Sequence, residues 1–252
     1  MAASLAQVVD LPAQSTPRQG GLLAAALPAP DGWERGLAIP FYGCGEPILR
    51  DKCVTAVDVA HRAGVAEFPA FPIEQGSTCS TLSQLDHEEF ALARLNATTE
   101  WALGRQLATD QVGTGAASFL DSTDLGAAGD VVAGIGCLEE EVAMTGFGSR
   151  YFLHASPRTA AALRDAGMMN NDGRSPSGAR WIISPGYAGL DAGRVWATGP
   201  VWAGTSVPDV HAAVGHRTND DEAFALRAGI VAFDPCVNIS LTVPVGDCPT
   251  AP

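Results

Sequence analysis

The sequence predicts an α+β protein built around one long helix. Residues 83–108, SQLDHEEFALARLNATTEWALGRQLA, follow helical periodicity, whereas the segments on either side are rich in glycine, proline and short extended pieces. The closing segment, 236–245, alternates apolar and polar residues, as does a strand with one buried face. No internal repeat is present, so early and late segments are expected to pair across long stretches of sequence.

The composition indicates a folded protein whose surface is partly covered by other molecules. Charged residues make up 17% of the 252 residues, against about a quarter in an average soluble domain. Copies of the same chain are the simplest cover. The formal net charge is −13, and no basic stripe of the kind that binds nucleic-acid phosphates is found. No stretch approaches the roughly 18 consecutive apolar residues of a membrane helix, and the short run 22–27 is not read as a signal peptide.

The first third of the chain has too little apolar mass to fold alone. Residues 1–36 contain several prolines and the pair Gly20-Gly21, which predicts an arm that is ordered only where it lies on something. Residues 37–82 contain the extended pieces LAIPFYGCG, CVTAVDVA and EFPAFPIEQG. Pro69 and Pro72 cannot donate to a strand ladder, which predicts edge strands or a projecting hairpin. Such a hairpin needs a partner surface.

The long helix is predicted over Asp86–Ala108, a length of roughly 35 Å. Asp86 can cap its N-terminus, and Glu89, three residues on, completes a capping-box pattern. Its apolar residues form two adjacent stripes at helical spacing: Phe90, Ala93, Ala97 and Trp101, and beside them Leu92, Leu95, Leu103 and Leu107. This broad apolar arc predicts that the helix packs on more than one surface.

An α/β block follows the glycine-marked loop QVGTGAASF. Helices are predicted over 130–146 and 156–167, because each begins at a capping residue and ends at a glycine. Strands are predicted in YFLHAS (151–156), ARWIIS (179–184) and RVWATGPVWAG (194–204). The block therefore mixes helices and buried strands.

No catalytic, cofactor-binding or metal-binding residue is predicted. The chain lacks a nucleophile elbow and a P-loop, and His87-Glu88-Glu89 lacks the second histidine of a zincin helix. Gly113-Thr114-Gly115, followed by Ser118, falls short of a dinucleotide fingerprint, which leaves only a weak phosphate-cradle interpretation.

Other reactive residue types have simpler structural interpretations. Glu139–Glu141 point in three directions on a helix, which favours a solvated face over a metal site. His154 sits in an apolar strand and is expected to be a hydrogen-bonded core histidine. The tryptophans are expected to be core or interface anchors. They are Trp33, Trp101, Trp181, Trp196 and Trp202.

The six cysteines, at positions 44, 53, 79, 137, 236 and 248, form no CxxC pair. The five histidines complete no zinc spacing with them. Buried free thiols are the favoured interpretation. A bridge among Cys44, Cys53 and Cys79 stays open, because these three share one extended region.

The order of these parts resembles the major capsid proteins of tailed phages, the Hong Kong ninety-seven fold shared with encapsulins. Two stretches carry most of the likeness. The segment ALARLNATTEWALGRQLATDQVGTG is similar to the spine helix of that family and its glycine turn. The segment DVVAGIGCLEEEVAMTGFGSRYFLHASPRTAAALRDAG is similar to the helix, strand and following helix of the family's axial domain. The likeness is one of element order over about three quarters of the chain, without an invariant signature.

The resemblance implies a domain division and a function. Residues 1–36 would be an N-terminal arm, 37–82 an extended loop reaching a neighbour, and 128–225 the axial domain. Residues 83–127 and 226–252 would form the peripheral domain with the spine helix and the closing strand.

The implied function is a non-enzymatic structural protein that assembles into an icosahedral shell around a double-stranded DNA phage genome. Its partners would be itself, as pentamers and hexamers, with scaffold, portal or decoration proteins and packaged DNA bound without sequence specificity, and no membrane. It would lie in the virion after assembly in the host cytoplasm. The acidic charge suits an inner wall of the shell that does not bind the DNA phosphates tightly.

Some members of that family join subunits by an isopeptide bond between a lysine of the extended loop and a distant asparagine. Lys52, the only lysine, lies in the matching region, and Asn238 is one candidate acceptor among several. A solvated lysine is the simpler interpretation, and no glutamate that would catalyse such a bond is identified.

Three alternatives stay open. An encapsulin-like shell around an enzyme is the first, although the long N-terminal arm favours a virus. Another virion part, such as a tail or head-completion protein, is the second. A small hydrolase that uses scattered Ser, His and Asp residues is the third, since catalytic groups need not be adjacent in sequence.

Overall fold

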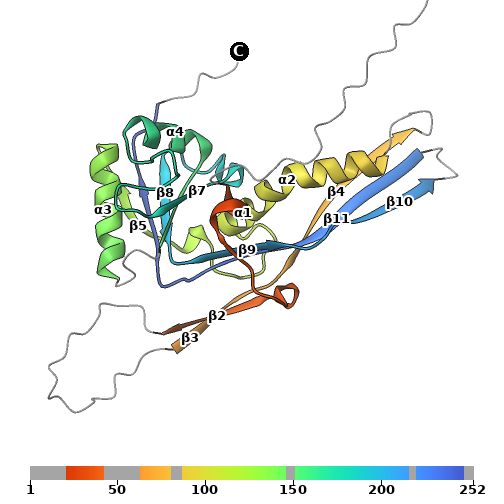
Figure 1. Cartoon of the computed structure of the whole chain (residues 1–252), viewed down its shortest axis with the longest axis horizontal. Helices are drawn as coiled ribbons and strands as arrows, with labels where there is room; N and C mark the ends of the chain where they lie inside the picture. Colours follow the sequence, from red (N-terminus) through yellow and green to blue (C-terminus); the bar gives the residue numbers. More distant parts are fainter. Residues whose placement is uncertain (1–20, 43–62, 81–86, 146–150, 216–219, 247–252) are drawn as a thin grey trace, which may run out of the picture.

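The computed structural model describes residues 21–42, 63–80, 87–145, 151–215 and 220–246. At one end of an elongated molecule a long helix lies on a long sheet, and at the other end two shorter helices cover a second sheet (Figure 1). The α+β class predicted from the sequence is confirmed.

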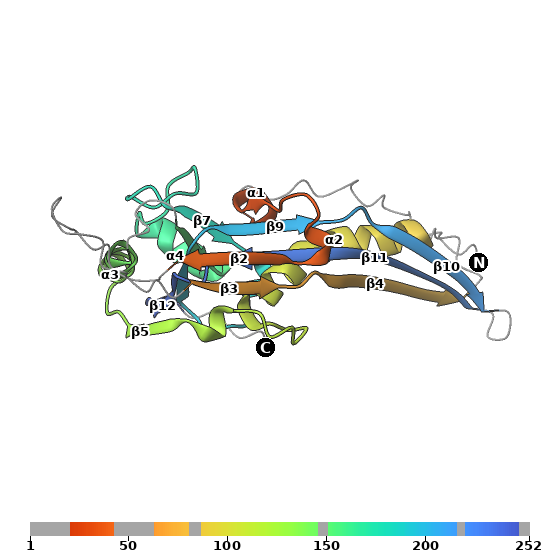
Figure 2. The same ribbon diagram turned by 90° about the horizontal axis from the view of Figure 1, so that it is seen from below.

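The long sheet is organised around one long strand, β11 (Asp220–Phe233). One edge of β11 pairs antiparallel with β4 (Phe71–Ser80). The other edge pairs with β10 (Asp209–Gly215) and then with β9 (Val201–Thr205). Figure 2 shows β4, β11 and β10 running side by side. Pro72 lies in β4, an edge strand among the described residues, as its missing donor predicts.

The helix α2 (His87–Thr109) packs on this sheet, and its bounds match the predicted helix to within one residue. Leu95 and Leu103, from one of the two predicted apolar stripes, are 0% exposed. The other stripe was expected to pack as well, but Phe90 and Trp101 are 37% and 42% exposed. Within this chain the helix therefore buries only part of its apolar arc.

The second sheet has five strands, and two helices cover one of its faces. In spatial order the strands are β5 (Thr123–Ala127), β12 (Asn238–Thr242), β8 (Arg194–Thr198), β6 (Phe152–Ala155) and β7 (Arg180–Ile183). The helices are α3 (Val131–Met144) and α4 (Pro157–Asp165). They contribute Ile135, Leu138 and Leu163 to a core shared with the sheet. The predicted helices and the strands at 151–156 and 179–184 are confirmed.

An aromatic cluster fills the space where the second sheet meets the long helix and sheet. Phe119, in the short helix η2 (Phe119–Asp121), stacks on Trp196 with ring centroids 5.0 Å apart. Tyr187, in η3 (Pro185–Tyr187), lies 5.4 Å from the Phe119 ring. Both rings belong to the core that contains the buried side chains of α2, so the two halves share one continuous interior.

The segment RVWATGPVWAG was predicted to lie in strands, and the structure divides it between the two sheets. β8 ends at Thr198, and β9 begins at Val201. Between them, a Cβ on Gly199 would lie 2.9 Å from the Asp234 carbonyl oxygen, so only glycine fits at this crossing. Pro200 cannot continue the ladder, which lets the chain change sheets.

The closing strand belongs to a different sheet from the one expected. β12 pairs with β8 and β5, not with the sheet under α2. Conversely β9 and β10, which fall within the expected axial range 128–225, lie in the long sheet. The alternation of apolar residues along β12 indicates that one face is buried, but it does not indicate which sheet the strand joins. On the opposite face of β12, Ser240 is 0% exposed, so this face is buried as well. The expectation that only one face of the strand is buried is therefore wrong.

The described part of the expected arm packs on its own chain. Leu22, in the short helix α1 (Leu22–Ala25), is 0% exposed, and its N–H donates to Glu100 Oε1 of α2 at 2.5 Å. Arg180 Nη2 donates to the Ala24 carbonyl at 2.9 Å. The strand β1 (Leu27–Pro28) then pairs with β9, and the short helix η1 (Trp33–Arg35) follows. Residues 21–35 therefore belong to the body, because Leu22 and Ala25 fill its core; residues 1–20 lie outside the described ranges.

A separate antiparallel hairpin leaves the body below the long sheet (Figure 1). β2 (Leu37–Tyr42) pairs with β3 (Ala63–Phe68), from Leu37 opposite Phe68 to Tyr42 opposite Ala63. This agrees with the predicted projecting hairpin. The piece CVTAVDVA lies outside the described residues.

Candidate assembly surfaces

His154 is a structural core residue, as predicted. It is 0% exposed, its Nδ1 lies 3.0 Å from the Tyr187 hydroxyl and its Nε2 lies 2.8 Å from Thr198 Oγ1. Burial lowers its pKa to about 3, so the ring is neutral at pH 7. A neutral imidazole held between two hydroxyls in the core is not available to a substrate.

The glycine loop after α2 binds a carboxylate of its own chain. Asp110, with φ of 46°, accepts hydrogen bonds from the Thr114 N–H at 3.0 Å and the Gly115 N–H at 2.8 Å. Burial raises the pKa of Asp110, but these hydrogen bonds, with those from the Thr114 hydroxyl and Gln106, leave it below its usual value. The two amides that would cradle a phosphate are thus occupied.

The glutamates of α3 do not form a metal site. Glu139 accepts hydrogen bonds from the Tyr151 hydroxyl at 3.1 Å and from Ser177 Oγ at 2.5 Å, and of the three glutamates only Glu140 is exposed. The prediction of a solvated face is therefore right for Glu140 and wrong for Glu139. In the described ranges, no group of three or more His, Cys, Asp or Glu side chains could hold a metal ion.

None of the helices in the described ranges has the length and hydrophobicity to cross a bilayer.

The cysteines and the proposed cross-link partners are only partly described. Cys137 is an exposed free thiol and Cys236 is disulfide-bonded, so the expectation of buried free thiols is wrong for both. The side chains of Cys44, Cys53 and Cys79, among which a bridge stayed open, lie outside the described residues. Lys52 lies outside them too. Asn238 is half-buried, and its Nδ2 donates to the Ser118 carbonyl at 2.8 Å. This asparagine therefore has a structural role.

The β2–β3 hairpin is the first surface suited to assembly. Its base is anchored by Phe68, which is 2% exposed and packs in the main core. Farther along, Val65 is 60% exposed. Among the described residues the two strands pair only with each other, so both outer edges carry backbone groups available to another chain.

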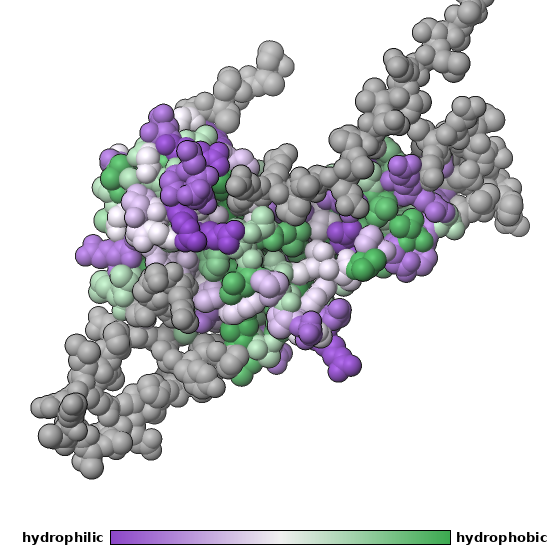
Figure 3. All heavy atoms as spheres, in the orientation of Figure 1, coloured by the Kyte–Doolittle hydropathy of each residue, from purple (hydrophilic) through white to green (hydrophobic). Residues whose placement is uncertain are grey.

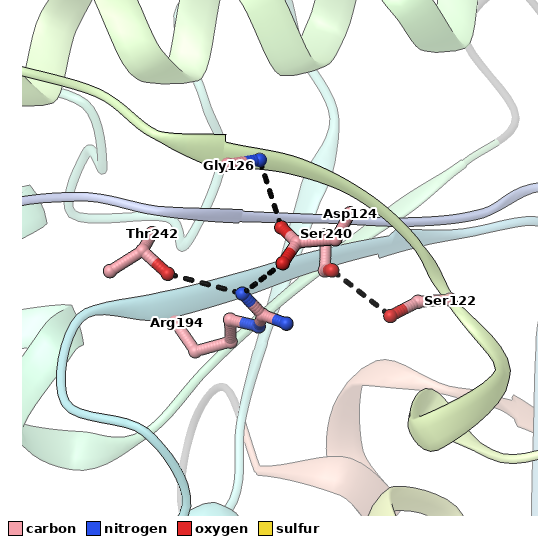
Figure 4. Close-up of polar contacts among 6 residues, drawn as sticks. All are labelled: Ser122, Asp124, Gly126, Arg194, Ser240 and Thr242. Carbon is pink, nitrogen blue, oxygen red and sulfur yellow. Dashed lines mark hydrogen bonds and ion pairs between the residues drawn. The ribbon is translucent and has the colours of Figure 1, made fainter.

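The strand β5 is the second surface: among the described residues it pairs only with β12, which leaves its other edge open, and all five of its residues are exposed. Figure 4 shows how polar contacts fix it to its neighbours. Asp124 accepts from Arg194 Nη1 of β8 at 2.9 Å and from the Gly126 N–H at 2.9 Å. Hydrogen bonding by Gly126, and then the Arg194 contact, lower the pKa of Asp124. Ser122 Oγ donates to Ser240 Oγ of β12 at 3.0 Å, so the edge is held in place yet uncovered.

Two helices add exposed apolar side chains. On α3, Val132 and Met144 are 49% and 52% exposed, and on α2 Phe90 and Trp101 are partly exposed. Figure 3 shows apolar residues among polar ones over the end that carries α2 and the long sheet. Trp181 and Trp196, by contrast, are 1% and 5% exposed, which agrees with the core positions expected for tryptophans; the exposed Trp101 stays a predicted interface residue.

The arrangement of the sheets and helices is shared with solved structures of phages. A structure from Gordonia phage Cozz matches with a TM-score of 0.60 at 14% identity, over 98% of this chain and 92% of that one. A structure from Mycobacterium phage Adephagia matches with a TM-score of 0.61 at 10% identity, over 97% and 96%. The capsid of a native GTA particle matches with a TM-score of 0.59 at 11% identity, over 98% and 96%.

The chain has the phage major-capsid fold. The resemblance drawn from element order is thereby confirmed at the level of the fold. No protein-family model matches the chain, and no curated protein matches it by sequence. The capsid fold therefore rests on three-dimensional structure.

Sequence reasoning missed the open edge at β5 and the strands β10 and β11 of the long sheet. β11 contains the nearly continuous apolar run AFALRAGIVAF, in which Ala223, Ala225 and Val231 are buried. An apolar run of this kind is consistent with a buried strand and could have indicated it. The exposure of β5 had no signal in the sequence, because it depends on which strands flank it.

Proposed function

We propose that this protein is a structural, non-enzymatic subunit that self-assembles into the icosahedral capsid shell of a double-stranded DNA phage. The observation that carries the proposal is the match over 97–98% of this chain and 92–96% of the phage and GTA chains. A match of this extent supports one capsid-like architecture for the chain.

The open edges support self-association. Natural sheets usually protect their edge strands, because exposed edges pair with other chains. Here the β2–β3 hairpin and β5 both leave edges unpaired in the described part of the chain. Contacts between identical copies can cover such edges, and a closed symmetric shell adds many weak contacts into one stable assembly.

We assign the domains of the capsid family from the pairing of the strands. The long sheet with α2 would be the peripheral domain, and the second sheet with α3 and α4 the axial domain that forms pentamers and hexamers. The hairpin and residues 43–62 would be the extended loop. Scaffold, portal or decoration proteins would be further partners. The subunit would assemble in the host cytoplasm and remain in the virion.

The acidic charge fits a container that releases its DNA. A formal net charge of −13 disfavours tight contact with phosphates, so the packaged DNA would be held without sequence-specific binding. We expect no shift of double-stranded DNA in a gel at moderate salt. A clear shift, or a strongly basic inner surface of the shell, would contradict this part of the proposal.

Electron microscopy of the protein expressed alone tests the proposal. Closed polyhedral particles are the expected result. Rings or tubes would favour a tail or head-completion protein, and a protease-resistant monomer at high concentration would contradict a shell. Particles isolated from the producing cells should contain nuclease-protected DNA; an enzyme cargo would instead indicate an encapsulin-like compartment. Stoichiometric labelling of one serine by a mechanism-based probe would revive the hydrolase alternative.

A further inference from the structure

The solvent-exposed face of α2 carries arginine and aromatic side chains. Phe90, Arg94, Ala97 and Trp101 recur every three or four residues and are exposed, and Arg105 follows one turn later. We call these five residues the arginine–aromatic stripe. They contain two positive charges and no carboxylate, in a chain whose formal net charge is −13.

The two arginines of the stripe have no acidic partner among the described residues. The Arg94 guanidinium lies 5.8 Å from the Phe90 ring centroid, and its Nη1 lies 3.5 Å from the Gly76 carbonyl. Arg105 Nη1 donates to the Ala188 carbonyl at 3.2 Å. A guanidinium has five N–H donors, so each arginine keeps donors for an acceptor from outside the chain.

The residue types define the kind of partner. Tryptophan and arginine dominate the energetics of protein interfaces, and Trp101 is 42% exposed in the middle of the helix. Arginine binds carboxylates with two parallel hydrogen bonds. The stripe therefore fits a protein segment that presents carboxylates beside an apolar side chain.

The chain itself supplies such a segment at the end of the long sheet. There β10 and β11 extend beyond α2 (Figure 1). β11 begins with three acidic residues, Asp220-Asp221-Glu222, and two residues later Phe224 is 36% exposed. Glu222 is exposed and has no ion pair within the described residues. The sheet end thus combines negative charge with an exposed aromatic ring.

We propose that the acidic end of β11 in one copy docks on the arginine–aromatic stripe of a second copy. The two surfaces are different parts of the molecule, so the contact is head-to-tail, and contacts of this type generate closed assemblies when the rotation between copies closes. The inference rests on the proposed capsid function and assigns a charged contact to it.

A charge swap tests the contact. Arg94→Glu and Glu222→Arg should each lower the association constant of this contact by about tenfold, which corresponds to about 1.4 kcal/mol per contact. Because a shell repeats the contact many times, the fraction of protein in closed shells at fixed concentration should fall by at least that factor. Combined in one chain, the two changes should restore assembly. Arg164→Glu, the same charge change at an exposed position of α4, is the matched control and should assemble like the wild type. Size-exclusion chromatography and electron microscopy give the fractions, and circular dichroism checks that each variant is folded.

The outcomes separate this inference from the proposed function. If the wild-type protein forms no closed shells, the capsid function itself fails. If it forms shells and both single variants assemble normally, or if the double variant does not recover, the docking contact is overturned. Trp101→Ala provides a second measurement: a folded variant with wild-type assembly would also contradict the contact. Normal assembly of Arg94→Glu together with weaker DNA binding would reassign the stripe to nucleic acid.

Discussion

Gly104 of α2 and Gly186 of η3 pack directly against each other where the two halves of the molecule meet. A Cβ on Gly104 would lie 3.3 Å from the Gly186 Cα. A Cβ on Gly186 would lie 2.4 Å from both the Trp101 carbonyl oxygen and the Arg105 nitrogen. Because η3 closely follows the edge strand β7, this backbone contact fixes the long helix against the second sheet.

Gly186→Ala should therefore destabilise the protein by about 1–3 kcal/mol, the usual cost of overpacking, because rigid backbone atoms surround the site. Thermal unfolding of variants in the same assembly state measures the change. Gly136→Ala is the matched control, since no atom lies within 4 Å of a Cβ at that helical position. It should leave stability unchanged or raise it by about 0.5–1 kcal/mol. Equal effects of both variants would contradict the close contact.

Leu22→Ala should destabilise the protein by about 2–5 kcal/mol, because Leu22 is fully buried between α1 and the core. Leu27→Ala, at a position that is 42% exposed, should cost much less. Denaturant unfolding of both variants gives the comparison. If Leu22→Ala were as mild as its control, residues 21–25 would not be part of the folded body.

His154 should make the protein acid-sensitive below about pH 6.5. Its pKa is about 3 in the folded state, against about 6.5 in an unfolded chain, so protons bind preferentially to the unfolded state between these values. Its contribution to stability is complete above pH 6.5 and falls by up to about 1.4 kcal/mol per pH unit as the pH drops toward 3.

The variant His154→Gln tests this assignment, because an amide can still bond the hydroxyls of Tyr187 and Thr198 without titrating. The difference in melting temperature between pH 7 and pH 4.5 should be smaller for the variant than for the wild type. Parallel pH profiles for the two proteins would show that other groups cause the acid sensitivity.

Asp124→Asn should loosen β5 without unfolding the protein. Asparagine keeps an acceptor for the Gly126 N–H but loses the ion pair with Arg194, an exposed contact of less than about 1 kcal/mol. Hydrogen exchange should become faster in Thr123–Ala127 and remain unchanged in α2. In the wild type the same loosening is expected as the pH falls below the ordinary carboxyl value of 3.8, because the Asp124 carboxylate stabilises the folded state only when ionised. Unchanged exchange in β5 would contradict this role.

The sequence predicted elements where one chemical signal dominated. The helix α2 could be predicted because Leu95, Leu103 and Leu107 recur at helical spacing over several turns. The helix α4 could be predicted from Ser156, whose side chain accepts from the Thr159 N–H, and from Pro157 in the first turn. These signals are local, since they involve hydrogen bonds and packing within one element.

The sequence predicted no catalytic site because it contains no local catalytic motif. In the structure, His154 and Asp110 have other roles. His154 bonds two hydroxyls, and Asp110 occupies the amides of the glycine loop. The sequence could not show these partners, because Tyr187 and Thr198 are far from His154 along the chain. It indicated only that a core histidine needs some partner.

By itself, the sequence determined the α+β class, the long helix, the projecting hairpin and the acidic charge, because composition and periodicity act over short stretches. Only the tertiary structure decided that β12 joins the second sheet, that Gly199 and Pro200 pass the chain from one sheet to the other, and that Phe90 and Trp101 stay exposed. The partners of a strand and the exposure of a side chain depend on which distant segments compete for the same surface. The free energy of pairing between two such segments cannot be read from the residue pattern of either segment alone.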